Sequence, residues 1–387
     1  MKFLPLIIVA FIVVFSSCKT EVDLNAPYKN TTVVFGLINP DFNGDNLINE
    51  LDTQWIKINK TFLGTGDNTV YAGIRDSSEY KDEDFESKVV ESMVNGNVVF
   101  TYPIFSTTVS NKSIDGIFYG PEQTLYYFVP ESSGLPQNAE YHIKLKFTDG
   151  REVDATTDIV NYTGFSFITP QVNASLILAQ PSSLGGVNFV DPVSVRWYSA
   201  SNAKLYDVVL RFHYTEEIYS SPTWSGSPIS STVKFVDYRL GSQTAAELSA
   251  GNPMKVEFSG LGFFTFLKNT IPINPNARRI IGYLGADQKT RCFDVILTMG
   301  NEELASYIEV NTVSGSIIQE RPVYTNVNNG LGLFASRGSR KVTDIKLVGT
   351  DNNNIPNPGN LFAFFVPNLT AELNFCDPSP SSDYYCH

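Results

Sequence analysis

Apolar and polar residues alternate with a period of two along much of the chain, which is the pattern of half-buried β-strands. In EYHIKLKFTDGREVDATTDIV, Tyr141, Ile143, Leu145 and Phe147 would share one face, and the DG pair would make a hairpin turn. VVESMVNGNVVFTYPI carries a second hairpin signal, NG, and TTVVFGLI and TQWIKINKTFL also read as strands. These segments predict a β-sandwich over residues 31–160.

A second β-domain is predicted over residues 161–387. In DPVSVRWYSASNAKLYDVVLRFHYTE, alternating apolar residues end at Trp197, and a second alternating run begins at Tyr206. A core Trp on one strand facing a Tyr-led strand resembles a fibronectin type III or immunoglobulin-like module. Further along, FFTFLKN is ambiguous between strand and helix, and RCFDVILTMGNEELASYIEVNT is predicted as strand, turn and strand. The fold class is therefore expected to be all-β, with two β-sandwich domains.

The amino-terminal stretch MKFLPLIIVAFIVVFSSC predicts export. One cation precedes an apolar run that is too short to span a bilayer comfortably, and small residues lead into Cys18. This ending resembles the lipobox of bacterial lipoproteins, in which the Cys is acylated. We therefore expect a signal peptide over residues 1–17, lipidation of Cys18 and a flexible tether over residues 18–30. Lys19, in place of an aspartate that retains lipoproteins in the inner membrane, favours the outer membrane. The alternative is an ordinary secretory signal with an incidental Cys.

The amino-acid composition limits the classes of partner that we expect. The formal net charge is −12 and no basic run occurs, so nucleic acid is an unexpected partner because both would be negatively charged. Cys376 and Cys386 lie in the tail NFCDPSPSSDYYCH, and an oxidising compartment favours a disulfide between them. The alternative is a metal site that includes His387. Cys292 lies within a strand pattern and is expected to be a small buried residue.

The stretch DFNGDNLINELD matches the ligand order of a calcium loop. Its sixth position is Asn46 rather than Gly, and strand patterns flank it, so a polar loop between two strands is the competing interpretation. In the calcium interpretation the loop is a structural brace and Ca²⁺ is the one cofactor expected. The ligands would be side-chain oxygens of Asp41, Asn43, Asp45 and Asp52 with the backbone carbonyl of Leu47.

No catalytic constellation emerges from the sequence. His142 and His213 lie on outward-facing strand positions, and neither G-x-S-x-G nor H-E-x-x-H occurs. Glu302 and Glu303 are expected in a turn without an apolar context that would raise a carboxyl pKa. We therefore expect a protein that is not an enzyme. The alternative is an envelope hydrolase. Two carboxylates roughly 5–10 Å apart in a cleft would favour this alternative.

Aromatic residues are the remaining candidate binding groups. Tyr and Trp platforms grip sugars and also form the energetic centres of protein interfaces, although most aromatic residues are expected to cover the cores. A flat platform of exposed Tyr and Trp would favour a surface glycan-binding protein. The aromatic residues in or beside predicted loops are Tyr71, Tyr80, Tyr102, Tyr119, Tyr126, Tyr127, Tyr219 and Trp224.

The segment RPVYTNVNNGLGLFASRGS, with CKTEVDLNAPYKNTTVVFGLINP and FTDGREVDATTDI, resembles outer-membrane lipoproteins of the Bacteroidetes that carry a domain of unknown function. The resemblance implies a tethered amino-terminal β-domain and a carboxy-terminal NGLGLF-like element. Genes of this group often accompany TonB-dependent transporters, which implies an accessory binding subunit of a transporter barrel or envelope complex. The physical reading of NNGLGLFASRG is a Gly-punctuated apolar segment that packs where backbones approach closely.

Overall fold

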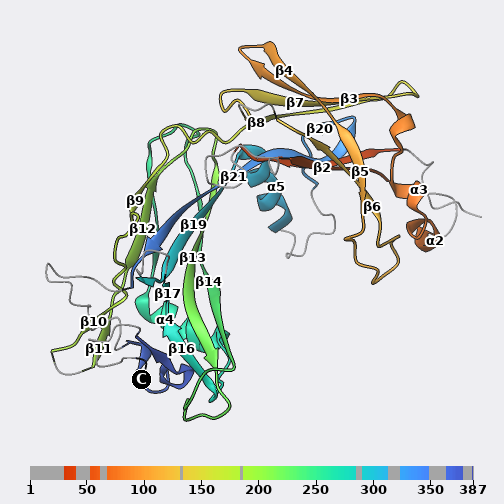
Figure 1. Cartoon of the computed structure of the whole chain (residues 1–387). Coiled ribbons are helices and arrows are strands. Elements are labelled where there is room, and N and C mark those ends of the chain that lie inside the picture. The colour runs from red at the N-terminus through yellow and green to blue at the C-terminus, as the bar shows by residue number, and fades with distance from the viewer. Residues whose placement is uncertain are drawn as a thin grey trace, which may run out of the picture.

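The computed structural model describes residues 30–40, 53–61, 68–130, 134–183, 186–284, 290–312, 323–347, 363–377 and 386. Strands dominate this part of the chain and form two β-sandwich halves set at an angle to each other (Figure 1). The expectation of an all-β sandwich fold is thus confirmed. Cys18 and the tether up to residue 29 lie outside the described residues.

The first half packs two sheets against each other. One contains β1 (Thr32–Ile38), β2 (Gln54–Lys60), β5 (Phe105–Val109) and β6 (Gln123–Phe128) in the order β1-β2-β6-β5. The other has the order β20-β8-β7-β3-β4, from β3 (Phe85–Val94), β4 (Asn97–Pro103), β7 (Glu140–Phe147), β8 (Glu152–Asp158) and β20 (Val327–Asn328). Short helical turns α2 (Asn68–Ala72), α3 (Arg75–Ser78) and η1 (Asp82–Asp84) lead into β3.

Both predicted hairpins are present in this half. The NG turn joins β3 to β4, with Asn95 and Gly96 at φ of 51° and 76°, the left-handed conformation that a two-residue hairpin turn requires. The DG pair lies in the turn between β7 and β8, and the inward residues of β7, from Tyr141 to Phe147, are all buried.

The second half places two sheets around the larger core. β9 (Ser166–Thr169), β12 (Val193–Tyr198) and β15 (Pro253–Phe258) form one sheet. The facing sheet contains β13 (Leu205–Ile218), β14 (Ser230–Thr244), β16 (Ala277–Ile281), β19 (Phe293–Gly300) and β22 (Phe375–Cys376). Trp197 and Tyr206 are fully buried between the sheets, with ring centroids 5.8 Å apart. The predicted core Trp therefore does face the Tyr-led strand.

Smaller elements complete this half. The ambiguous segment FFTFLKN belongs to a helix, α4 (Gly260–Thr270), whose N-cap Ser259 accepts a hydrogen bond from the Gly262 backbone. Two short hairpins pair β10 (Ala179–Pro181) with β11 (Val187–Phe189) and β17 (Tyr283–Leu284) with β18 (Thr290–Arg291). A turn of 3₁₀ helix, η3, spans Ala371–Leu373.

A single long strand, β21 (Gly330–Ile345), joins the two halves. Its first part pairs in parallel with β1, and its second part pairs antiparallel with β19, so one ten-stranded sheet runs through both halves. Gly332, at φ of 112°, has its backbone so close to Val34 that an added Cβ would collide with the Val34 carbonyl. The glycines of NGLGLF thus permit the close backbone approach that the sequence indicates.

The segment before and within β21 contributes to the core of the first half. Val327 and Phe334 are buried with residues of β1, β2, β6 and β7, although they lie in the range predicted as the second domain. Apart from Val327 and Phe334, the buried residues of the first hydrophobic core end at Ile159, and those of the second core begin at Val160. The division of the chain into domains at residue 160 stays a prediction.

The prediction of a second strand after RCFDVILTM is wrong. β19 forms, but it is followed by a helix, α5 (Glu302–Thr312). The Asn301 side chain accepts a hydrogen bond from the Leu304 backbone, as an N-cap does, and Leu304 and Tyr307 recur at helical spacing to pack on Leu333 and Ala335. Among the described residues, no helix is long and apolar enough to cross a membrane.

Cys376 and Cys386 form the predicted disulfide. We expect that replacing both with Ser lowers the free energy of unfolding by about 2–3 kcal/mol, because the bridge restricts the unfolded chain over a short loop. Urea denaturation of the double variant measures this difference. Denaturation curves that coincide for the variant and the wild type would contradict it.

Candidate functional site

A row of aromatic rings crosses three neighbouring strands of the first half. Trp55 on β2 is opposite Tyr127 on β6, and Tyr127 is opposite Phe105 on β5. Ring centroids are 5.3 Å apart for Trp55 and Tyr127 and 5.7 Å apart for Tyr127 and Phe105. Trp55 is 44% exposed and Phe105 is 48% exposed. We call these three residues the aromatic row.

Strand alternation explains why these rings face outward. The neighbours Ile56, Tyr126 and Phe128 are at most 1% exposed and fill the core on the other face of the sheet. The aromatic row therefore occupies the face opposite the core, where polar residues are the ordinary choice for a half-buried sheet.

The outward face around the aromatic row is also apolar. Phe35 and Leu37 on β1 are 42% and 39% exposed. Phe35 contacts Tyr307 of α5 edge to face, with centroids 6.1 Å apart, so α5 covers the neighbouring part of the same face. In Figure 1, α5 lies in the angle between the two halves. Phe35 is opposite Lys57, two residues along β2 from Trp55, so its contact with Tyr307 places α5 on the face that carries the aromatic row.

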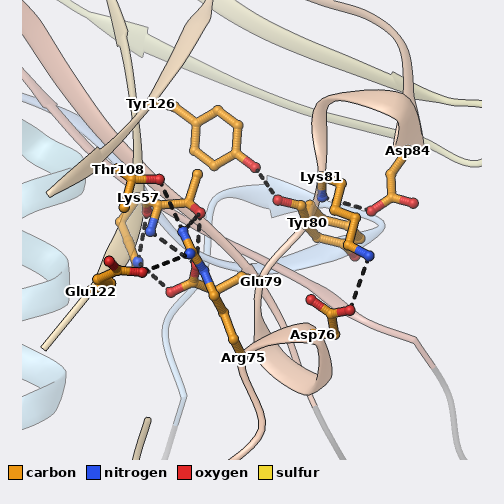
Figure 2. A network of polar contacts seen from close by, with 11 residues as sticks. Lys57, Arg75, Asp76, Glu79, Tyr80, Lys81, Asp84, Thr108, Glu122 and Tyr126 are labelled. Atoms are coloured by element: carbon orange, nitrogen blue, oxygen red, sulfur yellow. Dashed lines mark hydrogen bonds and ion pairs between the residues drawn. The ribbon is translucent and has the colours of Figure 1, made fainter. Parts of the chain in front are cut away.

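A charged network lies at the other end of β6, around α3 (Figure 2). Arg75 donates to Glu79 at 2.9 Å, to Glu122 at 3.2 Å and to Thr108 at 3.0 Å. Glu79 also accepts from both the backbone and the hydroxyl of Thr124, at 2.9 Å and 2.7 Å. Burial would raise the pKa of Glu79, but these hydrogen bonds from Thr124 and Arg75 outweigh it and lower the pKa.

A cavity of about 430 Å³ borders this network. Its charged lining residues are already in ion pairs: Arg75 with Glu79, Lys81 with Asp76, and Asp82 with Lys88. Because these charges satisfy one another, the network serves as a brace that fixes α3 against β2 and β6.

The carboxyl groups of Asp158 and Glu303 lie at the start of α5. Burial raises the pKa of both, and repulsion between neighbouring carboxylates adds to the effect. The expectation that Glu303 lies in a turn without a raised pKa is therefore wrong, because α5 carries it against Asp158. A raised pKa suits a general acid, but neither residue lines the 430 Å³ cavity or the second cavity, of about 390 Å³, beside β14 and β15.

Glu303→Gln is expected to raise the melting temperature at neutral pH. The raised pKa means that the folded state holds this proton more tightly than the unfolded chain, so the ionised carboxylate costs stability. That cost is present above the raised pKa and is relieved as the pH falls towards the ordinary value of 4.5. Thermal unfolding followed by circular dichroism across this range measures it.

Glu309→Gln, at an exposed position of the same helix, is the matched control and should leave the melting curve unchanged. Parallel pH profiles for Glu303→Gln and the wild type would contradict the prediction.

His142 and His213 lie on outward strand faces, as expected. His142 Nε2 is 3.4 Å from Glu140, and His213 Nε2 is 2.9 Å from Asp294. His213 is more enclosed than the sequence indicates, because the rings of Phe235 and Tyr283 flank it. Cys292 is buried as predicted.

The predicted calcium ligands Asp41, Asn43, Asp45, Leu47 and Asp52, together with Cys18 and His387, lie outside the described residues. Within the described part, no group of three or more His, Cys, Asp or Glu residues is arranged to hold a metal ion.

Sequence reasoning placed only one residue of the aromatic row, Tyr127, among its candidates. Tyr80, Tyr102, Tyr126 and Tyr219 are core residues, as expected for most of the set. The signal for Trp55 was present in TQWIKINK, since Ile56 and Ile58 point inward and Trp55 must then point outward.

Comparisons with known proteins add little. No family model and no curated protein matches the chain. A chain from a chaperone–tip adhesin complex of CFA/I fimbriae is 11% identical, with 60% of this chain and 92% of that chain covered. Its TM-score of 0.12 carries no argument about fold or function.

Proposed function

We propose that the chain is a non-enzymatic, lipid-anchored binding protein of the outer membrane that holds a glycan on the aromatic row. The observation that carries the proposal is that Trp55 and Phe105 are exposed on either side of the half-buried Tyr127, with the three rings in one line on an otherwise well-packed sheet. Cys18 is the acylation site in this proposal. It supplies attachment, and the first half supplies recognition.

The chemistry of the row suits a sugar chain. Aromatic rings offer flat apolar faces for the C–H faces of sugars at low cost in side-chain entropy. The row crosses two inter-strand steps, so its outer rings are roughly 10 Å apart and can contact more than one sugar unit. Thr107, two residues along β5 from Phe105, offers a hydroxyl to the sugar.

The tilt between the rings narrows the ligand class. The interplanar angles are 47° between Trp55 and Tyr127 and 37° between Phe105 and Tyr127. Both angles exceed the roughly 20–25° that sheet twist alone gives between adjacent strands, so the three rings do not form one flat surface. A polysaccharide whose successive units rotate about the chain follows these planes better than a flat ribbon does. We therefore propose a twisted or branched soluble glycan.

The second candidate is an accessory subunit of a TonB-dependent transporter or envelope complex. Phe35 and Leu37 favour it, because they extend the aromatic row into a larger exposed apolar face. Such a face is typical of a protein interface as well as of a ligand groove. The transporter barrel would then cover the row and the β1 residues together.

One preparation tests both candidates. The acylated, tagged protein is purified from detergent-solubilised outer membranes, its co-purifying chains are identified by mass spectrometry, and the same protein is applied to a glycan array. Selective binding of glycans supports the first proposal. A stoichiometric barrel partner without glycan binding supports the second candidate and contradicts the first.

A further inference from the structure

A second apolar surface lies at the end of the first half, away from the aromatic row. The loop between β5 and β6 and the segment of α2 and α3 together expose five apolar side chains. Ile114 is 72% exposed, Val70 60%, Phe118 57%, Ile117 54% and Ile74 45%. We call these five residues the apolar tip.

The two segments of the apolar tip are held together by the backbone. The Tyr119 N–H donates to the Ala72 carbonyl at 2.9 Å, and the loop is closed by a bond from the Lys112 N–H to the Pro121 carbonyl at 3.1 Å. The apolar side chains are thus presented by an ordered loop rather than by a chain end. Figure 1 shows α2 beside the end of the β5–β6 hairpin.

The chain that leads to the anchor leaves the described structure at the same end of the first half. Tyr80, two residues after α3, donates from its hydroxyl to Asn30 Oδ1 at 3.0 Å. Arg151 donates to the Asn30 carbonyl at 3.2 Å. Asn30 is twelve residue steps from Cys18, a distance of at most roughly 40 Å when the chain is fully extended.

We propose that the apolar tip inserts into the surface of the membrane that carries the lipid anchor. The inference rests on the lipid anchor of the proposed function, since the anchor confines this end of the molecule to the vicinity of the bilayer. Exposed Ile, Val and Phe side chains are the groups that enter the boundary between head groups and acyl chains. Anchor and tip together fix the orientation of the first half.

The charges on the loop point to apolar insertion rather than electrostatic attraction. Lys112 lies beside Phe118, with its Nζ 5.9 Å from the ring centroid, and Asp115 accepts from Ser113 at 3.2 Å. Glu122 is paired with Arg75. With no cationic excess on the loop, insertion should depend little on salt or on anionic lipid.

This orientation places the aromatic row away from the bilayer. The row lies at the end of β6 opposite the loop, and the four residue steps from Gln123 to Tyr127 span roughly 13 Å. A ligand on the aromatic row would therefore be held above the membrane surface.

A fluorophore attached to the apolar tip tests the inference. Ile117→Cys is labelled with an environment-sensitive maleimide in the acylated chain, which is then reconstituted in phosphatidylcholine vesicles with brominated acyl chains. Native cysteines do not interfere, because Cys18 carries the lipid in the acylated chain, Cys376 and Cys386 are bridged, and burial raises the pKa of the Cys292 thiol to about 12. Val233→Cys on β14 is the matched control, since Val233 and Ile117 are both 54% exposed.

The expected result is a blue-shifted emission at position 117 that brominated lipid quenches several-fold more than emission at position 233, with little change at high salt. Equal emission and quenching at the two positions in anchored protein overturns the inference while leaving the anchor intact. Quenching at position 117 that requires a co-purified barrel overturns it as well, because the occupant is then a protein.

A failure of the anchor is distinguished by flotation. If the chain does not float with vesicles through an acyl group, the unacylated chain decides the question. The inference is supported if the unacylated chain floats with vesicles and the double variant Ile117→Ser, Phe118→Ser floats about tenfold less. The control double variant Ile229→Ser, Val233→Ser should float as the unsubstituted chain does. An unacylated chain that stays in solution overturns the inference.

Discussion

Arg279→Met is expected to lower the free energy of unfolding by about 3–5 kcal/mol. Arg279 is fully buried on β16, and its guanidinium donates to Glu216 at 2.9 Å, to the Leu373 carbonyl at 2.6 Å and to the Pro272 carbonyl at 2.9 Å. Met has a similar volume but donates no hydrogen bond. The variant therefore leaves the buried Leu373 carbonyl, the Pro272 carbonyl and Oε2 of the buried Glu216 without this partner.

The neighbours of Arg279 explain why the loss spreads beyond one ion pair. Leu373 precedes β22, which pairs with β16 and carries Cys376 of the disulfide. Lys234 also pairs with Glu216, but it is 46% exposed and cannot replace a buried guanidinium. Arg279 thus connects the carboxy-terminal segment to the sheet of the second half.

Urea denaturation monitored by tryptophan fluorescence measures the difference in the free energy of unfolding between Arg279→Met and the wild type. Arg239→Met is the control, because Arg239 is 69% exposed in its pair with Asp207 and such pairs contribute about 1 kcal/mol or less. A loss below about 1 kcal/mol for Arg279→Met would contradict the role assigned to this residue.

Replacing Trp55 and Tyr127 together with Ala is expected to weaken glycan binding by at least about thirtyfold, which corresponds to about 2 kcal/mol. The two rings are neighbours and contribute the central contact area of the aromatic row. Since Trp55 is 44% exposed and the core lies on the opposite face, the variant should keep its fold. Isothermal titration with the glycan selected on the array measures the change.

Phe235→Ala supplies an aromatic control for this variant. Phe235 is 53% exposed on β14 of the second half, so its loss removes a comparable exposed ring away from the aromatic row. Its affinity for the glycan should equal that of the wild type. An equal loss in both variants would contradict recognition by the aromatic row.

The sequence predicted the elements whose pattern is local. The hairpins β3–β4 and β7–β8 follow from period-two alternation and from turns that need Gly or Asn, and the buried Trp197 follows from the same alternation. α5 was missed because Leu304 and Tyr307 recur at helical spacing over a short stretch, directly after a genuine strand.

The aromatic row and the buried Arg279 depend on long-range pairing, which local pattern does not encode. Trp55 and Phe105 lie in one row only because β6 pairs with both β2 and β5 and places Tyr127 between them. In the same way, β21 pairs with both β1 and β19, so a segment near residue 330 completes the core of the first half. Alternation shows which face a residue takes, but not which strand lies beside it.

Titration of the array-selected glycan into the wild-type protein and into the Trp55→Ala, Tyr127→Ala double variant tests the central claim most directly. The account predicts saturable binding by the wild type, a loss of at least about thirtyfold in the double variant and unchanged melting temperatures. Wild-type protein that binds no glycan on the array, or a double variant that binds as tightly as the wild type, would contradict it.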